Sequence, residues 1–397
     1  MAARVGRPTL PSTDEEVWRY SRVGELDLDA WHAAEPCTGV PEPVAALLGS
    51  LGHLAAAVVV RNGSIVAARV DDDLAARGLH VGALVDGPDA SDALGCVAGD
   101  GPDVFTALND LSTIDPVLVH VPAGLTVDAP IVVIDWIDDD RVSVHPRLVV
   151  RLGADASARV LEWHGSDDVA AFAAPVTELE LAPAARLGHT GVQLRGRRVW
   201  ELASVLARVE RDATLSVGLV GLGGDYARVR TDCRLVGRGA TGDLSAVYFG
   251  TGTQTLDFRT FQHHDAPDTT SNLLFKGAVD DQSRSVYTGL IRVEPGARGT
   301  SAYQTNRNLK LSDDAWAESV PNLEIETNDV RCSHASTVSP VDPDQRFYLE
   351  SRGVPTELAE RLVVLGFFDE VVDALAVHEV RAIVSAEIAD RLTTGAN

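Results

Sequence analysis

Short apolar runs of strand length dominate the middle of the chain, from about residue 115 to residue 338. Val117, Val119 and Val121 alternate with other residues, and a nearly continuous apolar run extends from Pro130 to Trp136. Period-two alternation is typical of half-buried strands, and short continuous runs are typical of fully buried ones. This pattern predicts a mainly β core in which helices are rare.

Small-residue turns separate these runs at nearly regular intervals. Their centres lie at Ala154, Ala185, Ala213, Ala240 and Ala297, with separations of 31, 28, 27 and 57 residues. The last separation is close to twice 28, and a period of this size indicates a solenoid whose stacked repeats share one core. A β-sandwich, the competing architecture, needs tight hairpins every 8–12 residues or so. Few Asn-Gly or Asp-Gly turns follow residue 63, so we favour a parallel or mixed β-helix.

Helical or mixed patterns flank this core, which gives an N-terminal region at 1–114, a β-helix core at 115–345 and a C-terminal helical domain at 346–397. In the N-terminal region, Asn62-Gly63 lies between two apolar runs and predicts a β-hairpin. Short helices are predicted over 41–51 and 103–112.

Three helices are expected near the C-terminus. Pro355-Thr356 begins one, Gly366 lies near its expected end, and Asp369 is a candidate cap for the next. The third carries apolar residues between 380 and 392. These helices either pack on one another to close the solenoid or offer one face to a partner.

The charge balance is strongly acidic, with 34 basic and 58 acidic residues and a net charge of −24. This excess argues against nucleic acid or an anionic membrane surface as the main partner. It fits a general solubility bias or one specific basic partner. The longest apolar runs are too short to span a bilayer, and the first residues contain no apolar signal region.

Cysteine usage favours the cytosol. Cys37, Cys96, Cys233 and Cys332 are widely separated, and no CxxC pair is present. Such spacing predicts neither a disulfide framework nor a zinc ribbon. We therefore expect a cytoplasmic protein.

Common catalytic and nucleotide-binding motifs are missing, and two weaker candidates remain. His263-His264-Asp265 could ligate a metal, although the adjacent Ala266-Pro267-Asp268 favours an exposed polar turn. Asp280-Asp281 resembles a carboxylate pair, but adjacent residues of one strand point to opposite faces. Neither candidate indicates an enzyme strongly.

The clearest candidate site follows the turn at 327–329. A strand begins at Val330, and its alternation places Cys332 and His334 on one face. A neutral imidazole is a common metal ligand. Cys332 lies roughly 6–7 Å away along the strand, too far for rigid ligation of one ion by both groups. We therefore favour His334 as the ligand and interpret Cys332 as a small buried hydrophobe.

Several segments of the chain carry a specific resemblance. They read LEIETNDVRCSHAST, FYLESRGV and the Gly-Phe of LGFF, preceded by SNLLFKGAVDDQSRSVYTGLIRVEPGA, NRNLKLSDDA and an early WRY at residues 18–20. The chain resembles the SufB/SufD family of iron–sulfur cluster assembly scaffolds, and within it the SufD type. The likeness is strongest over about 257–368 and continues more weakly from about 105.

This resemblance implies a right-handed parallel β-helix with helical parts at both ends and a non-enzymatic role. The family implies a SufB-like partner subunit and a SufC-like ABC ATPase, with a transient cluster rather than a permanent cofactor. His334, and second Cys332, become candidate cluster ligands at the SufB interface. His334 could instead be a hydrogen-bonded interface residue. The ATPase is expected on the C-terminal helices, near Phe347, Tyr348, Arg352 and Gly353.

Two positions distinguish the SufD type from SufB. Ala335 stands where the SufB pattern has Glu, and Asn306 stands where SufB has Cys. Ala335-Ser336 also replaces the Gly-Ala common in SufD, which leaves the local turn undefined. A SufB-like cluster-holding subunit and a polysaccharide-active β-helix enzyme are the alternative functions. The sequence leaves open whether two copies pair in isolation and which proteins receive the cluster.

Overall fold

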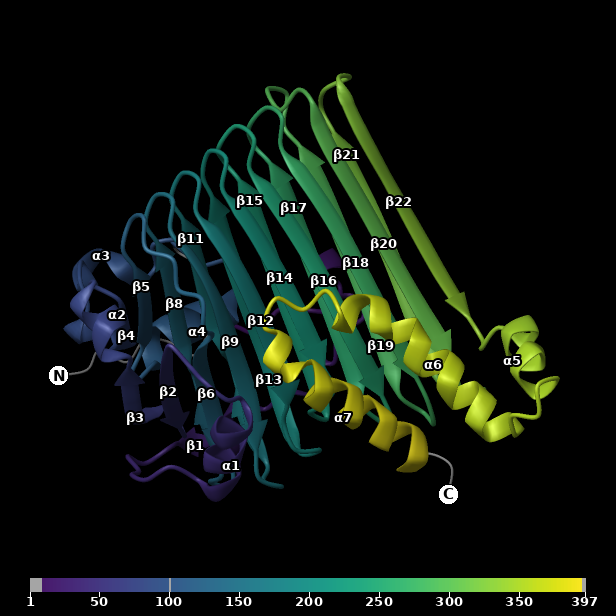
Figure 1. Cartoon of the computed structure of the whole chain (residues 1–397). Coiled ribbons are helices and arrows are strands. Elements are labelled where there is room, and N and C mark those ends of the chain that lie inside the picture. Colours follow the sequence, from purple (N-terminus) through teal and green to yellow (C-terminus); the bar gives the residue numbers. More distant parts are fainter. Residues whose placement is uncertain (1–8, 100, 395–397) are drawn as a thin grey trace.

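The core of the protein is a β-solenoid, shown by a computed structural model that describes residues 9–99 and 101–394. From β5 onward the chain passes back and forth between two sheets, and successive turns stack in parallel register (Figure 1). This architecture confirms the predicted solenoid and excludes two face-packed antiparallel sheets. We call the two sheets A and B, and one full turn through both a rung.

Sheet A follows the order β21-β19-β17-β15-β13-β11-β8-β5-β4. Its strands are β4 (His80–Ala83), β5 (Val117–Val121), β8 (Arg147–Leu152), β11 (Val176–Leu181), β13 (Val199–Val209), β15 (Tyr226–Leu235), β17 (Thr255–His264), β19 (Arg284–Val293) and β21 (Trp316–Ile325). The short strands β1 (His32–Ala33), β7 (Val142–Val144) and β10 (Ala171–Ala173) branch from this path.

Sheet B follows the order β22-β20-β18-β16-β14-β12-β9-β6-β2-β3. Its strands are β2 (Ala56–Arg61), β3 (Ser64–Val70), β6 (Ile131–Ile137), β9 (Ser157–Ser166), β12 (Arg186–Leu194), β14 (Thr214–Gly221), β16 (Thr241–Gly250), β18 (Thr270–Val279), β20 (Thr300–Lys310) and β22 (Val330–Ser339). The largest hydrophobic cluster lies between the inner faces of the two sheets.

The regular turns share a two-residue backbone motif. A residue with positive φ is followed by a small, fully buried residue, as at Ala185, Ala213 and Ala240. A small side chain fits there because neighbouring turns stack directly on one another. The predicted series of alanine turns skips one turn between Ala240 and Ala297. That turn lies at Asp268-Thr269, where Thr takes the place of Ala. The first turn centres on Ala156 rather than the predicted Ala154.

The N-terminal region extends both sheets. Asn62 and Gly63, both with positive φ, form the predicted hairpin between β2 and β3. Because β2 pairs with β6 and β4 pairs with β5, strands from before residue 115 continue the solenoid. The boundary at 114/115 stays a prediction. The helices of this region are α1 (Glu42–Ser50), α2 (Asp72–Ala76), α3 (Ala90–Ala93) and α4 (Val104–Ser112).

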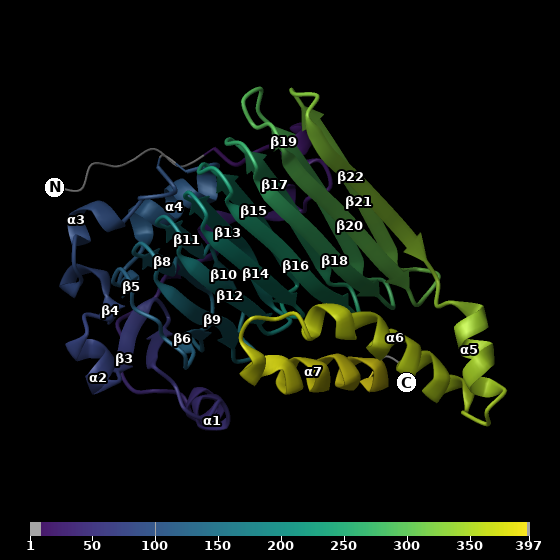
Figure 2. The ribbon, with the colours of Figure 1, turned by 45° about the horizontal axis from the view of Figure 1, so that its top comes forward.

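The C-terminal helices are α5 (Pro343–Glu350), α6 (Thr356–Val372) and α7 (Arg381–Thr394). Helices α6 and α7 lie across the outer face of sheet B, whereas α5 projects beyond the last strands (Figures 1 and 2). The predicted break at Gly366 and Asp369 was wrong, because both residues lie inside α6. Phe368 is buried beside Phe249 of the sheet, and this packing outweighs the low helix propensity of glycine.

Candidate functional site

The last two strands leave one end of the solenoid open. Strand β21 pairs with β19, and β22 pairs with β20; within the described residues neither strand has a second sheet partner. Each sheet therefore ends in an edge with unpaired backbone groups. Ile325 on β21 and Val338 on β22 are 41% and 46% exposed, so apolar side chains accompany these edges.

Strand β22 presents the two predicted ligand residues on its inner face. Cys332 and His334 are in register with Ala302 and Gln304 of β20, which are both buried between the sheets. The alternation predicted from the sequence therefore places both residues toward the solenoid interior. Because this rung is the last one, that interior is open to solvent.

The two residues differ in accessibility. Cys332 is partly buried and packs against the apolar cluster that contains Ile291 and Ala302. Burial raises the pKa of its thiol, which disfavours the thiolate that binds metals. His334 is exposed. The imidazole is thus the more available ligand, although the ligand roles of both residues stay predictions.

Asn306, near this end of the core, is a buried structural residue. Its Nδ2 donates to Tyr248 Oη at 2.8 Å and to the Phe275 carbonyl oxygen at 3.1 Å. Its Oδ1 accepts a hydrogen bond of 2.8 Å from Asn308 Nδ2. Because its polar atoms are engaged inside the core, this amide is not available to an incoming group.

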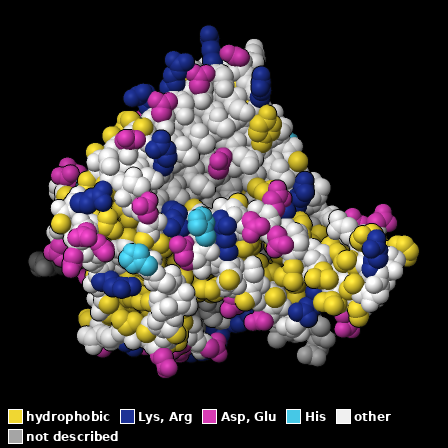
Figure 3. Space-filling model, in the orientation of Figure 1, with side chains coloured by type: hydrophobic (Ala, Val, Ile, Leu, Met, Phe, Trp, Pro, Cys, Tyr) yellow, Lys and Arg dark blue, Asp and Glu magenta, His cyan; other side chains and the backbone are white. Residues whose placement is uncertain are grey.

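The residues predicted near a partner lie on a different element. Phe347 and Tyr348 of α5 are 69% and 57% exposed, and the Arg352 guanidinium lies 5.0 Å from the Tyr348 ring centroid. Gly353 has a φ of 86°, in the turn after α5. Hydrophobic side chains gather over the C-terminal helices in Figure 3. The structure thus holds two separate candidate surfaces, the open end and the helices.

A buried ionic network, which the sequence analysis missed, lies deeper in the solenoid. His164 is placed between two carboxylates, with Nε2 3.1 Å from Glu162 and Nδ1 3.2 Å from Glu201. His189 Nε2 contacts Glu162 at 2.9 Å, and Arg195 donates to Glu201 at 2.9 Å and also pairs with Asp135. The sequence pattern that could have indicated this network is the Glu-x-His spacing at 162–164, because it places both side chains on one face of β9.

This network shifts the pKa values of its members. Burial alone would lower the pKa of His164, but the charges and hydrogen bonds of Glu201 and Glu162 raise it to about 10. Burial alone would raise the pKa of Glu162, but hydrogen bonds from His164 and His189 hold it well below its usual range. The charged forms therefore persist inside the core.

The other two sequence candidates do not form sites. His264 ends β17 inside the core, where its ring nitrogens contact Thr269 Oγ1 at 2.8 Å and Ser271 Oγ at 3.0 Å. Burial lowers its pKa to about 4. The expectation of an exposed turn was wrong for this residue, because its side chain fills the interior. Asp280 and Asp281 lie in the turn after β18, not in one strand as expected.

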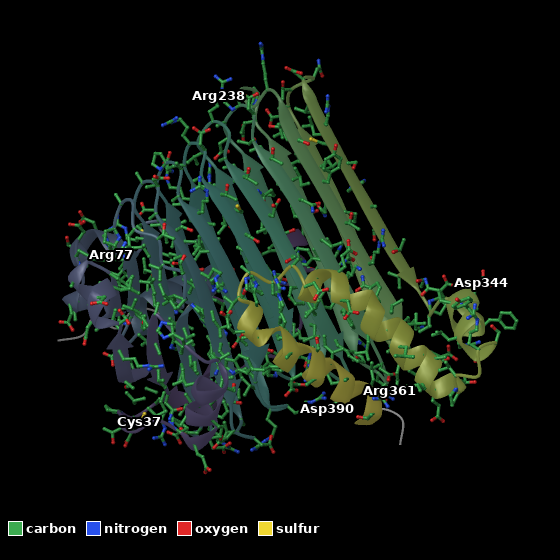
Figure 4. All side chains as sticks on the ribbon, in the orientation of Figure 1. Cys37, Arg77, Arg238, Asp344, Arg361 and Asp390 are labelled. Carbon is green, nitrogen blue, oxygen red and sulfur yellow. The ribbon has the colours of Figure 1, made fainter. Side chains whose placement is uncertain are left out.

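Turns at the far ends of the strands carry surface ion pairs between rungs. Arg238 pairs with Asp268 at 2.7 Å, and Figure 4 shows it far from Asp344 of α5.

Within 9–99 and 101–394, no group of three or more His, Cys, Asp or Glu residues is arranged to hold a metal ion. The role of His334 as a ligand stays a prediction.

The fold and this site define a β-solenoid protein whose terminal rung is open and carries an accessible histidine. The chain belongs to the SufBD family of the SUF system, which assembles iron–sulfur clusters, because the SufBD core-domain model matches residues 136–367. This match covers more than half of the chain and includes the rungs that end at β22.

Named relatives support this assignment. The chain is 40% identical over 223 residues to a SufBD family protein of Mycobacterium tuberculosis, covering 54% of this chain and 56% of the relative. It is 31% identical over 255 residues to the SufD protein of Escherichia coli, covering 64% and 60%. The SufD protein of Bacillus subtilis is 37% identical over 166 residues, covering 42% and 38%. The matches thus span about half of the curated relatives' length.

The helices that the structure describes include none long and apolar enough to cross a membrane. The cytoplasmic location expected from the cysteine pattern stays a prediction.

Proposed function

We propose that this protein is the SufD-type subunit of an iron–sulfur cluster assembly scaffold and has no catalytic activity of its own. It pairs with a SufB-like subunit through the open end of the solenoid and binds a SufC-like ATPase through its C-terminal helices. The nascent cluster is cargo, shared with the SufB-like partner rather than held as a permanent cofactor. The observation that carries this proposal is the unpaired terminal rung with His334 on its inner face.

Pairing at the open end follows from the properties of sheet edges. The edges of β21 and β22 present backbone donors and acceptors that a partner strand satisfies by extending the sheet. The exposed side chains of Ile325 and Val338 add apolar area to the same surface. A partner that continues both sheets would cover His334 and bring its own ligands beside the imidazole.

Docking at the helices rests on a second apolar surface. Leu358 and Leu362 of α6 are 45% and 44% exposed, in addition to Phe347 and Tyr348 of α5. The opposite side of α6 buries Val364 and Phe368 against sheet B. Deleting these helices would uncover that sheet face, so surface substitutions test docking more cleanly than truncation does.

The SufB-like alternative is disfavoured by Asn306. Where SufB has a cysteine, this chain places an amide whose hydrogen bonds are made within the core. This arrangement supports a subunit that contributes less of the cluster site than its partner.

The test is co-expression with SufB-like and SufC-like proteins, followed by purification through a tag on this chain. We expect both partners to be recovered. An edge variant, Ile325→Lys with Val338→Lys, should lose only the SufB-like partner. A helix variant, Leu358→Glu with Leu362→Glu, should lose only the ATPase.

Each variant is the control for the other, because both add two charges to exposed positions. Recovery of both partners by both variants would contradict the assigned surfaces. Recovery of neither partner by the parent chain would contradict the proposed function.

A further inference from the structure

Gln304 of β20 is a buried residue beside the candidate site. It is 1% exposed, and neither its Nε2 nor its Oε1 has a hydrogen-bond partner. Buried polar atoms are almost always paired, so an amide that lacks both partners requires an explanation. Its neighbour Asn306, two residues along the same face, has both amide atoms engaged.

The position of Gln304 relates it directly to His334. The two residues are register partners on adjacent parallel strands, and both point toward the solenoid interior. Paired strands lie about 4.7–4.9 Å apart, so rotation of the two side chains would bring the amide and the imidazole together, although no hydrogen bond joins them in this structure. On the facing sheet, a Cβ atom at Gly289 would overlap the Gln304 amide, so this glycine provides the space that the amide occupies.

The terminal rung contains a further unpaired polar atom. Ser319 Oγ on β21 is buried without a hydrogen-bond partner. Its register partner Tyr287 is buried in the solenoid core, which places Ser319 on the inner face of sheet A. Buried polar atoms without partners thus lie on both sheets near the end of the solenoid where His334 is exposed.

A histidine that binds a metal through one ring nitrogen generally donates its other ring N–H to a fixed acceptor. That hydrogen bond selects the tautomer and the orientation of the ring. Gln304 offers an amide oxygen that no other group of the described chain uses.

We propose that Gln304 is a positioning residue for His334, in which the amide oxygen accepts a ring N–H and leaves the other ring nitrogen free for a ligand. This inference rests on the proposed role of His334 in cluster assembly. It identifies the residue that would fix the orientation and tautomer of the imidazole for ligand binding.

The experiment uses ring ¹⁵N NMR of the isolated full-length chain, with the His334 signals assigned by their loss in His334→Ala. Three variants are compared: Gln304→Leu, Gln304→Glu and Gln262→Leu. Gln262 is the control, because it is equally buried and its amide interacts with the Cys233 thiol rather than with a histidine. It lies on β17, two strands before the edge strand of sheet A.

In the parent chain His334 should populate one neutral tautomer, whereas in Gln304→Glu the carboxylate should favour the protonated ring, as Glu201 and Glu162 do for His164. In Gln304→Leu the two tautomers should mix, and in Gln262→Leu the signals should match those of the parent. Gln304→Leu should keep the parent's unfolding midpoint or raise it, because it removes an unpaired buried amide. Unchanged His334 signals in Gln304→Leu, or equal changes in Gln262→Leu, would overturn the proposal.

A second measurement separates this inference from the proposed function. In a reconstituted complex with the SufB-like and SufC-like proteins, Gln304→Leu should slow cluster assembly about 10–100-fold, as is usual when a residue supporting a ligand is lost. Gln262→Leu should assemble clusters normally. If His334→Ala also assembles clusters normally, the proposed function fails, while the tautomer result still decides whether Gln304 positions the ring.

Discussion

At the scale of single residues, the solenoid interior tolerates charge only where charges are closely matched. His164 has a carboxylate on each side, and Arg195 links Glu201 to Asp135. Removing one member of such a network leaves the others buried and uncompensated, which costs more than the pair contributes. Exposed ion pairs at the turns carry no such penalty.

His164→Leu should therefore lower the free energy of unfolding by roughly 3–5 kcal/mol. Urea denaturation followed by circular dichroism measures this change. The control is Arg186→Ala, whose exposed pair with Asp155 spans 3.7 Å and should change stability by less than about 0.5–1 kcal/mol. Similar losses in both variants would contradict the importance assigned to burial.

The same residue predicts a pH dependence. The pKa of His164 is raised from 6.5 to about 10 in the folded protein. The folded state then holds the proton more tightly than the unfolded state, so the stabilisation is fully present below pH 6.5 and is lost as pH rises toward 10. The stability difference between the parent and His164→Leu should shrink over this window. A difference that stays constant would show that His164 is neutral in the fold.

At the scale of elements, the strands and turns were predictable because their signals are local. Alternation identified β22 and the residues that share one of its faces, and small residues identified most turns. Helix α6 was not predicted in full, because Gly366 and Asp369 resemble a helix end in sequence. The packing of Phe368 against sheet B, which local sequence does not contain, carries the helix through that point.

The close contact between sheet B and the C-terminal segment depends on a glycine, which has no side chain. A Cβ atom at Gly188 of β12 would lie 2.5 Å from Ala376 Cβ, in the link between α6 and α7. Gly188→Ala should therefore destabilise this contact by about 1–3 kcal/mol, as expected for overpacking. The change would be detected by limited proteolysis, as cleavage in the segment that follows residue 353, and by thermal unfolding.

The matched control is Gly366→Ala inside α6, where a Cβ atom meets nothing within 4 Å. Alanine should stabilise the helix there by roughly 0.5–1 kcal/mol. Equal behaviour of the two variants would show that Ala376 does not pack closely against Gly188.

At the scale of the whole molecule, the two ends of the solenoid differ. The first end is extended by the β2–β3 hairpin and by β4, whereas β21 and β22 leave the last rung unpaired. Alternation alone could not place His334 at an open end, because openness depends on how the strands of the last rung are paired. The internal network was missed for a related reason, since its partners meet only when rungs stack and lie 37 residues apart at His164 and Glu201.

The most direct test of the account is cluster assembly by the reconstituted complex, with bound iron and sulfide measured for His334→Ala and Cys332→Ser. Complex formation by each variant is checked first by gel filtration. We predict that both variants form the complex and that only His334→Ala loses the cluster, because the imidazole is exposed at the open end and the thiol is partly buried against an apolar cluster. Loss of complex formation by His334→Ala would assign this residue a structural role at the interface. Normal cluster content in both variants would contradict the account.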